Sequence, residues 1–290
     1  MDIIVPIKQV PETSNVKMDP ETGTMLRAGV ETVVNPLDLY AIETAIRLKE
    51  LHGGTVTAVT MGPPPAEKAL REAIAMGCDT GVLISDRKFG GADTWATSYT
   101  IAQAIRAIGP YDLIIAGERA TDGDTAQVGP GIASWLDIPL ATYVAAITAV
   151  EPGSSGTGSS SAPDASGALI VERLVEEGYQ ILKVPMPALL TVVKEIASPR
   201  LPTLRGKKRA KATELPLYNT ENMDLDPAFL GLKGSPTKVV KIATPRVTRG
   251  GTVVHAGDEE GVVTAVDQLI AFLESRGLVP AAGASTGGRP

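Results

Sequence analysis

Residues 112–136 read DLIIAGERATDGDTAQVGPGIASWL, two apolar segments separated by a polar loop. The first segment, Asp112–Ala116, has the length and the β-branched content of a buried strand. After the loop, Ile132, Ala133 and Leu136 recur at helical spacing. A strand that opens through a Gly- and Asp-rich loop into a helix is the repeating unit of α/β proteins, so this stretch predicts that fold class.

The same alternation extends from residue 1 to about 140. The pattern predicts further strands at Ile3–Ile7, Thr55–Met61 and Gly81–Ser85, and helices at 38–51, 65–76 and 94–108. Asn35 is expected to cap the first helix, with Pro36 at its first position. Because a strand-helix-strand order favours right-handed crossovers, we predict a Rossmann-like parallel sheet with helices on both faces.

The rest of the chain divides into two parts. Further strands are expected at Thr142–Val150, Ala168–Leu174, Tyr179–Val184 and Ala188–Val193, so that residues 1–193 form one nucleotide-binding α/β domain. Its segment 153–167, GSSGTGSSSAPDASG, has the composition of a flexible insertion. Residues 194–290 are predicted from their irregular pattern to form an arm that wraps another subunit.

Two stretches define that second part. Residues 194–211 hold seven basic residues against one acidic residue, with two prolines and no periodicity. Residues 212–246 are expected to stay irregular because prolines interrupt them. Residues 262–276 are predicted to form an amphipathic helix with these side chains facing inward: Val263, Val266, Leu269, Ile270 and Leu273.

Composition narrows the function classes. The 290 residues carry a net charge of −6, which argues against a nucleic acid or an anionic membrane as the main partner. The single cysteine, Cys78, excludes an internal disulfide and a zinc cluster, so no metal site is predicted and a cytoplasmic location is expected. No apolar run approaches about 18 residues, so no transmembrane segment is expected. His52 and His255 lack a triad context, and no catalytic residue is predicted.

A ligand crevice is predicted where the strands end. The chain lacks the GxGxxG and GxxxxGK[ST] motifs, but residues 117–136 place a loop of cap-forming residues before a helix. Exposed amides there would suit a phosphate, and Gly123 and Gly129 would allow close approach. A capped helix with structural glycines explains the loop equally well. Four more corners, at 6–8, 35–38, 61–63 and 91–94, are expected at the same edge, and together they favour the crevice.

Several motifs together resemble the β subunit of the electron-transfer flavoprotein family. They cover nearly the whole chain, whereas the 153–167 insertion and the tail after about 280 depart from the family pattern. The motifs are VPIKQVP at 5–11, NPLD at 35–38, MGP at 61–63, ATDGDTAQVG at 120–129, EGYQ at 177–180 and PALLT at 187–191.

The resemblance implies an adenine nucleotide alpha hydrolase-like fold and a heterodimer with an α subunit that carries FAD. It also implies a nucleotide site in this chain, which holds AMP in ordinary members and a second FAD in electron-bifurcating members. The loops resemble the bifurcating branch, in which NADH is the electron donor and ferredoxin or flavodoxin the low-potential acceptor. The implied site residues are Pro6, Asn35, Pro36, Leu37, Asp38, Met61, Gly91, Asp93, Thr94, Ala120, Thr121, Asp122, Gly123, Asp124, Thr125, Ala126, Gln127, Val128, Gly129, Pro130 and Gly131.

The basic segment gains a role by the same resemblance. Leu204 matches a leucine with which the family docks a flavin dehydrogenase or a quinone oxidoreductase, and Arg200 and Arg205 would surround it. The alternative from the residues alone is a solvated charge run with one buried leucine. A different class, a stand-alone adenylate-binding sensor module, would lack both flavin and the docking leucine.

Overall fold

A computed structural model describes residues 1–12, 31–152, 167–240, 251 and 253–279. The predicted insertion and the C-terminal tail therefore lie almost entirely outside the described residues. The chain divides into two compact units, Met1–Ile242 and Ala243–Pro290.

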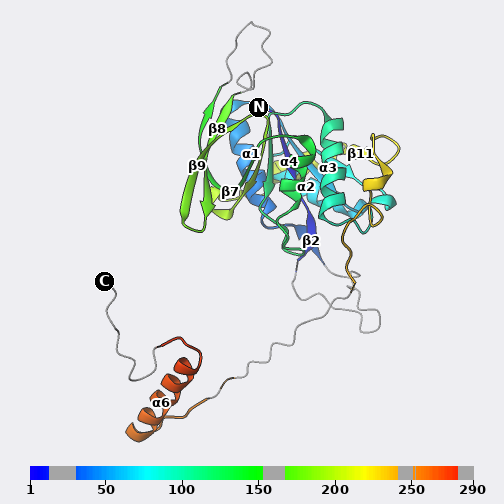
Figure 1. The fold of residues 1–290 in the computed structure, drawn as a ribbon. Coiled ribbons are helices and arrows are strands. Elements are labelled where there is room, and N and C mark those ends of the chain that lie inside the picture. Colours follow the sequence, from blue (N-terminus) through cyan, green and yellow to red (C-terminus); the bar gives the residue numbers. More distant parts are fainter. Residues whose placement is uncertain (13–30, 153–166, 241–250, 252, 280–290) are drawn as a thin grey trace. The chain divides into compact units, whose positions relative to one another are not determined.

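The first unit is built on a nine-stranded sheet with the order β11-β5-β4-β1-β6-β10-β7-β8-β9, so that β11 and β9 lie at its opposite ends (Figure 1). Neighbouring strands from β11 to β7 pair in parallel, and β7, β8 and β9 form antiparallel pairs. The bounds are β1 Ile3–Pro6, β4 Val56–Met61, β5 Thr80–Ile84, β6 Leu113–Gly117, β7 Leu140–Glu151, β8 Ala168–Val175, β9 Gly178–Pro185, β10 Ala188–Val192 and β11 Leu217–Tyr218. A separate antiparallel pair joins β2 (Gln9–Pro11) to β3 (Thr32–Val34).

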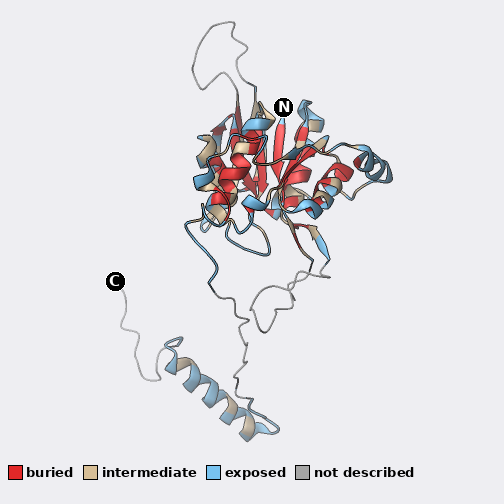
Figure 2. Ribbon diagram, turned by 90° about the vertical axis from the view of Figure 1, so that its right-hand side faces the viewer, coloured by how far each residue is buried: buried red, intermediate tan, exposed pale blue. Residues whose placement is uncertain are grey.

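Helices cover both faces of the sheet, as predicted. On one face α1 (Asp38–His52) and α2 (Glu67–Met76) pack against Ile3 and Val5, and on the other α3 (Thr94–Ile108) and α4 (Val128–Leu136) pack against Ile4. Successive β1 side chains thus enter opposite cores, which is why the strand reads as a continuous apolar run. Figure 2 shows the buried residues concentrated in the sheet and on the helix faces that meet it.

Two local predictions about helices are wrong. Asn35 does not cap α1, which begins at Asp38 after Leu37, because the Asn35 side chain is used in a longer-range network described below. Residues 194–211 do contain periodic structure, because the helix α5 covers Leu204–Ala212. Only Ala210 of α5 is buried, so the helix has no apolar stripe that a sequence pattern could reveal.

Contacts with α2 stabilise α5 instead. Arg71 of α2 donates to the carbonyls of Ala210 and Thr213, and Arg209 of α5 donates to the carbonyls of Ile74 and Cys78 at 2.8 Å each. Each arginine therefore satisfies carbonyl groups at the end of the other helix, where intrahelical partners are missing.

The predicted domain boundary at 193 and 194 differs from the division at 242 and 243. Beyond residue 193, β11 pairs with β5 through Leu217 opposite Leu83. Farther along, Met223 and Leu230 are buried in the core on the α3 side. Residues 194–240 thus complete the first unit. The predicted arm is therefore limited to residues that follow this unit.

The second unit contains α6 (Glu259–Ser275), which Asp258 caps by accepting a hydrogen bond from the amide of Gly261. No residue of α6 is buried, and Val263 and Leu269 are more than half exposed. The expectation that its apolar side chains face inward is therefore wrong for this chain taken alone. Across the part of the chain that the structure describes, no helix could cross a membrane.

Candidate nucleotide site and docking loop

Asn35 joins two of the predicted corners at the carboxyl edge of the sheet. Its side-chain amide donates at 2.9 Å both to Oδ1 of Asp38 and to the carbonyl of Arg119, and its Oδ1 accepts from the amide of Thr121 at 3.1 Å. Asn35 is fully buried. The corner at 35–38 and the loop after β6 are thus held together by one side chain, as the convergence of strand ends predicts.

Asp38 is a buried acid in the same network. Its Oδ2 accepts from the backbone amide of Lys8 at 2.7 Å. Burial raises the pKa of the Asp38 carboxyl to about 7, although the hydrogen bonds from Asn35 and Lys8 act to lower it. A Cβ on Gly117 would lie 2.4 Å from Oδ1 of Asp38, so only glycine fits at the end of β6. Asp38 therefore holds the corner together from a buried position.

Two ion pairs close the loop between β6 and α4. Lys8 Nζ lies 2.6 Å from Oδ1 of Asp122, and Arg119 Nε lies 2.9 Å from Oδ1 of Asp124. Asp124 and Ala126 have left-handed φ angles of 53° and 54°, a conformation that costs side-chain-bearing residues energy and that clusters at functional sites. Lys8 comes from the predicted corner that follows the first strand, whereas Arg119 is a cation at the crevice that the sequence pattern did not single out.

The loop does not cap α4. The N-cap of this helix is Gln127, which makes no side-chain capping hydrogen bond, so the prediction that residues 122–125 are cap-forming is wrong. Asp122 and Asp124 are engaged with the two cations instead. Among the described residues, the first amides of α4 therefore have no capping side chain, which is the arrangement that suits an anionic ligand.

The corner at 91–94 meets this loop through Thr94, whose hydroxyl donates to Oε1 of Gln127 at 2.9 Å. Asp93 makes its hydrogen bonds within the first unit, and its predicted contact with a cofactor stays a prediction. Its Oδ1 caps α3 by accepting from the amides of Trp95 and Ala96, and its Oδ2 accepts from the amide and hydroxyl of Thr237 at 3.0 and 2.7 Å. Asp93 thus ties the end of the first unit to the start of α3.

Two glycines of the motif serve packing. A Cβ on Gly129 would lie 2.6 Å from Cγ2 of Thr191 in β10, and one on Gly131 would lie 2.5 Å from the hydroxyl of Ser98 in α3. They let α4 approach the sheet and its neighbouring helix. Gly123, by contrast, has open space where a side chain would begin. The structural interpretation of the glycines is therefore correct for Gly129 and Gly131, and close approach of a ligand stays a prediction for Gly123.

The remaining implied residues surround this network. Pro6 and Met61 end β1 and β4, Pro36 and Leu37 precede α1, and Ala120, Thr125, Val128 and Pro130 lie in or beside the loop. Thr60, next to Met61, is 1% exposed, and its hydroxyl has no hydrogen-bond partner among the described residues. A buried polar atom without a partner, two cations and uncapped amides are donor and acceptor groups that fit a nucleotide at this edge.

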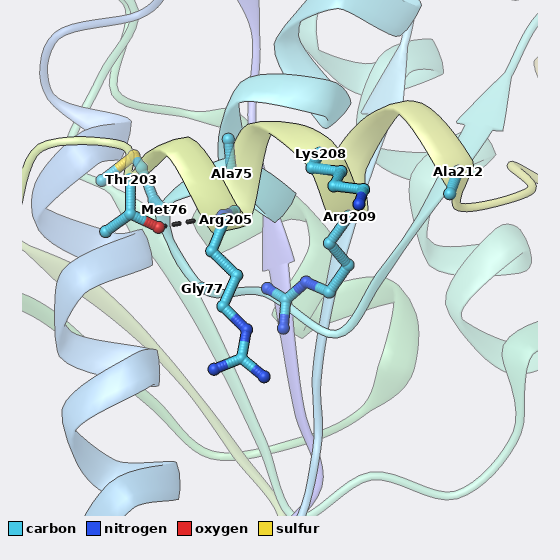
Figure 3. A pocket seen from close by; sticks show the side chains of 9 residues that line it. Ala75, Met76, Gly77, Thr203, Arg205, Lys208, Arg209 and Ala212 are labelled. Atoms are coloured by element: carbon cyan, nitrogen blue, oxygen red, sulfur yellow. Dashed lines mark hydrogen bonds between the residues drawn. The ribbon is translucent and has the colours of Figure 1, made fainter.

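The leucine that the family resemblance assigns to docking is exposed. Leu204 is 88% exposed at the first residue of α5, and Leu201 is 85% exposed three residues earlier. Thr203 caps α5 through the amide of Gly206, and Arg205 and Arg209 project from the helix beside a shallow groove against α2 (Figure 3). Arg200 does not surround Leu204 as a free cation, because its guanidinium is paired with Glu43 and Glu50.

A doubly covered parallel sheet with a loop cluster at its carboxyl edge defines a Rossmann-like α/β protein. The model of the electron transfer flavoprotein domain matches residues 22–219. The chain is 45% identical over 270 residues to the electron transfer flavoprotein subunit beta of Thermoanaerobacterium thermosaccharolyticum, which covers 93% of this chain and 98% of that protein.

Two other relatives carry more specific names. The chain is 44% identical over 255 residues to the caffeyl-CoA reductase-Etf complex subunit CarD of Acetobacterium woodii, covering 88% of this chain and 92% of that one. It is also 44% identical over 279 residues to the acryloyl-CoA reductase electron transfer subunit gamma of Anaerotignum propionicum, covering 93% and 98%. The chain belongs to the electron transfer flavoprotein family and is similar to its beta subunits along nearly all of its length.

Proposed function

We propose that this chain is the β subunit of a cytoplasmic heterodimeric electron-transfer flavoprotein and that it holds FAD in the crevice at the carboxyl edge of its sheet. The observation that carries the proposal is the network in which Asn35 joins Asp38 to the loop that contains Thr121. The names of the relatives support the electron-transfer role, and two of them refer to CoA reductases.

The residues of the crevice would divide the work of holding the nucleotide. Lys8 and the uncapped amides at the start of α4 would bind phosphate oxygens, with Asp122 releasing Lys8. Pro6 and Met61 would provide apolar contact. A flavin bound there would accept a hydride from NADH and pass on its two electrons one at a time. One electron would go to the FAD of the α subunit and the other to ferredoxin or flavodoxin. The alternative occupant is AMP, which would make the chain a non-bifurcating subunit.

Cofactor extraction tests the occupant. The purified heterodimer is denatured, and FAD and AMP are counted by chromatography. Two FAD per heterodimer support the proposal, whereas one FAD and one AMP contradict bifurcation, and absence of both flavin and an α subunit favours the adenylate sensor. Lys8→Gln should lower nucleotide content at this site, while Lys68→Gln, a change to an exposed lysine on α2, should not.

The second unit would bind the α subunit. The exposed apolar side chains of α6 are those that a partner must cover to keep the helix stable in water. A chain that ends at Ile242 should therefore keep the fold of the first unit and lose co-purification with the α subunit. Retention of the α subunit by this shortened chain would contradict the proposed arm.

Leu204 would anchor a flavin dehydrogenase or a quinone oxidoreductase. An exposed leucine among Arg205 and the other cations of α5 suits an apolar anchor with electrostatic steering. Leu204→Ala should slow electron transfer between the heterodimer and its dehydrogenase without changing flavin content. Leu51→Ala provides a matched control, because Leu51 is 77% exposed at the end of α1. Equal rates in the two variants would contradict docking through Leu204.

A further inference from the structure

Arg200 makes an unusually complete set of contacts for a partly exposed arginine. Its Nε lies 2.8 Å from Oε2 of Glu43, and its Nη1 lies 2.6 Å from Oε1 of Glu50. Its Nη2 donates to both glutamates, at 3.2 and 2.9 Å, and its backbone amide also donates to Oε2 of Glu43, at 3.1 Å. Both glutamates lie on α1, seven residues and therefore about two turns apart.

Glu43 is the buried partner in this contact, and it is shared with Arg47 of α1. Its side chain is 3% exposed, so its charge needs a partner within the protein. Burial acts to raise the pKa of Glu43, but the hydrogen bonds from Arg200 and Arg47 outweigh it and hold the pKa below the usual range. The carboxylate thus stays charged, and the guanidinium of Arg200 stays fixed on α1.

The exposed leucines lie immediately beyond this anchor. Leu201 follows Arg200 directly, and Leu204 comes three residues later. On the other side, Thr203 caps α5, and Gly206 packs so closely on α2 that a Cβ would lie 2.1 Å from the carbonyl oxygen of Ala75. The docking segment is therefore held at both ends, by α1 before the leucines and by α2 after them.

We propose that Arg200 is a positioning residue that presents Leu204 to the partner by fixing the preceding backbone to α1. The proposal rests on the docking function of Leu204 proposed above. It assigns Arg200 to an internal clamp, with no contact of its own to the partner. Lysine cannot replace it, because an ammonium group cannot make two planar forked contacts at once.

The expected effect on the KM follows from the fraction of molecules in which the segment around Leu204 holds the conformation that binds the partner. An apparent affinity falls in proportion to the fraction of molecules that hold the binding conformation. If Arg200→Lys leaves about one loop in ten correctly placed, the KM for the dehydrogenase rises about tenfold while kcat and flavin content stay the same. The change should also speed amide hydrogen exchange in residues 198–206 of the heterodimer.

The experiment uses the intact heterodimer and an acyl-CoA dehydrogenase that reduces the wild-type complex. The variants are Arg200→Lys, Leu204→Ala and the double variant. The control is Arg106→Gln, which removes a hydrogen-bonded arginine from α3. We expect the double variant to match Leu204→Ala alone, because a positioning residue has nothing left to position. Faster exchange should be confined to residues 198–206.

The contrary outcomes separate the two proposals. If Leu204→Ala does not change the KM, docking through this leucine is wrong. If Leu204→Ala raises the KM but Arg200→Lys changes neither the KM nor the exchange of residues 198–206, only the positioning role is wrong. If the effects of Arg200→Lys and Leu204→Ala on the KM multiply in the double variant, Arg200 contacts the partner directly and the clamp proposal is overturned.

Discussion

Replacing Asp38 with asparagine should change how the stability of the first unit depends on pH. The folded protein holds the pKa of this carboxyl near 7, against 3.8 for an unperturbed aspartate. Between these two values the unfolded chain binds fewer protons at this position than the folded chain does. The contribution of Asp38 to the free energy of unfolding is therefore greatest below pH 4, falls as the pH rises, and levels off above pH 7.

The size of the effect follows from the separation of the two pKa values. Each pH unit of separation corresponds to roughly 1.4 kcal/mol, so the contribution falls by about 4 kcal/mol in total. Asparagine does not titrate. Relative to the wild type, Asp38→Asn should become more stable by about 4 kcal/mol between pH 4 and pH 8. A constant penalty from the lost acceptor for the Lys8 amide shifts the whole curve without changing its slope.

Urea unfolding at a series of pH values measures this difference. Trp95 and Trp135 report on the first unit, because their rings pack together at the start of α3 and in α4 with centroids 4.6 Å apart. Glu43→Gln provides a control of opposite sign: its pKa is lowered, so the wild type should lose its advantage over this variant as the pH falls through about 4.5 and below. If the difference in the free energy of unfolding between Asp38→Asn and the wild type did not change with pH, the assignment of a buried, destabilising charge to Asp38 would be refuted.

Three further predictions concern other buried positions. Burial raises the pKa of Cys78 to about 12, so a thiol reagent should leave the folded protein unlabelled at pH 8 and label it fully in urea; rapid labelling of the folded form would contradict this. Thr60→Val should stabilise the nucleotide-free chain by about 1 kcal/mol in urea unfolding, because it removes a buried hydroxyl without a partner among the described residues; destabilisation would show that the hydroxyl is satisfied. Gly206→Ala should lower the melting temperature, at a cost of about 1–3 kcal/mol, because Ala75 leaves no room for a methyl group; an unchanged melting temperature would show that α5 can shift freely.

The sequence predicts most of this fold because its strands and first three helices bury apolar faces with a clear period. The predicted helix at 94–108 matches α3, and the strand predicted at Ala168–Leu174 differs from β8 by one residue. The α5 helix escapes prediction because its stability comes from contacts with α2, which no local pattern contains. Propensity and periodicity are informative only where a segment's own apolar residues determine its structure.

The candidate site is predictable to the same extent. Parallel strands end at one edge, so the corners at 35–38, 91–94 and 120–131 can be placed together from the sequence, and the contacts of Asn35 and Thr94 do join them. The roles of single residues depend on distant partners. Asp93 binds Thr237, and Gly129 accommodates Thr191, across separations that motif spacing does not encode.

The basic segment shows how this limit affects function. Counted along the sequence, its cations form one positive run, but the structure divides them into two groups. Arg200 is paired with glutamates of α1 and Arg209 donates to backbone carbonyls of α2, whereas Lys194 and, on α5, Arg205, Lys207, Lys208 and Lys211 are exposed. The exposed group can attract an acidic partner from solution, so raising the ionic strength should slow its association. The ion pairs of Arg200 act at short range and are less sensitive to salt, and in the proposed clamp they hold the backbone that precedes Leu204.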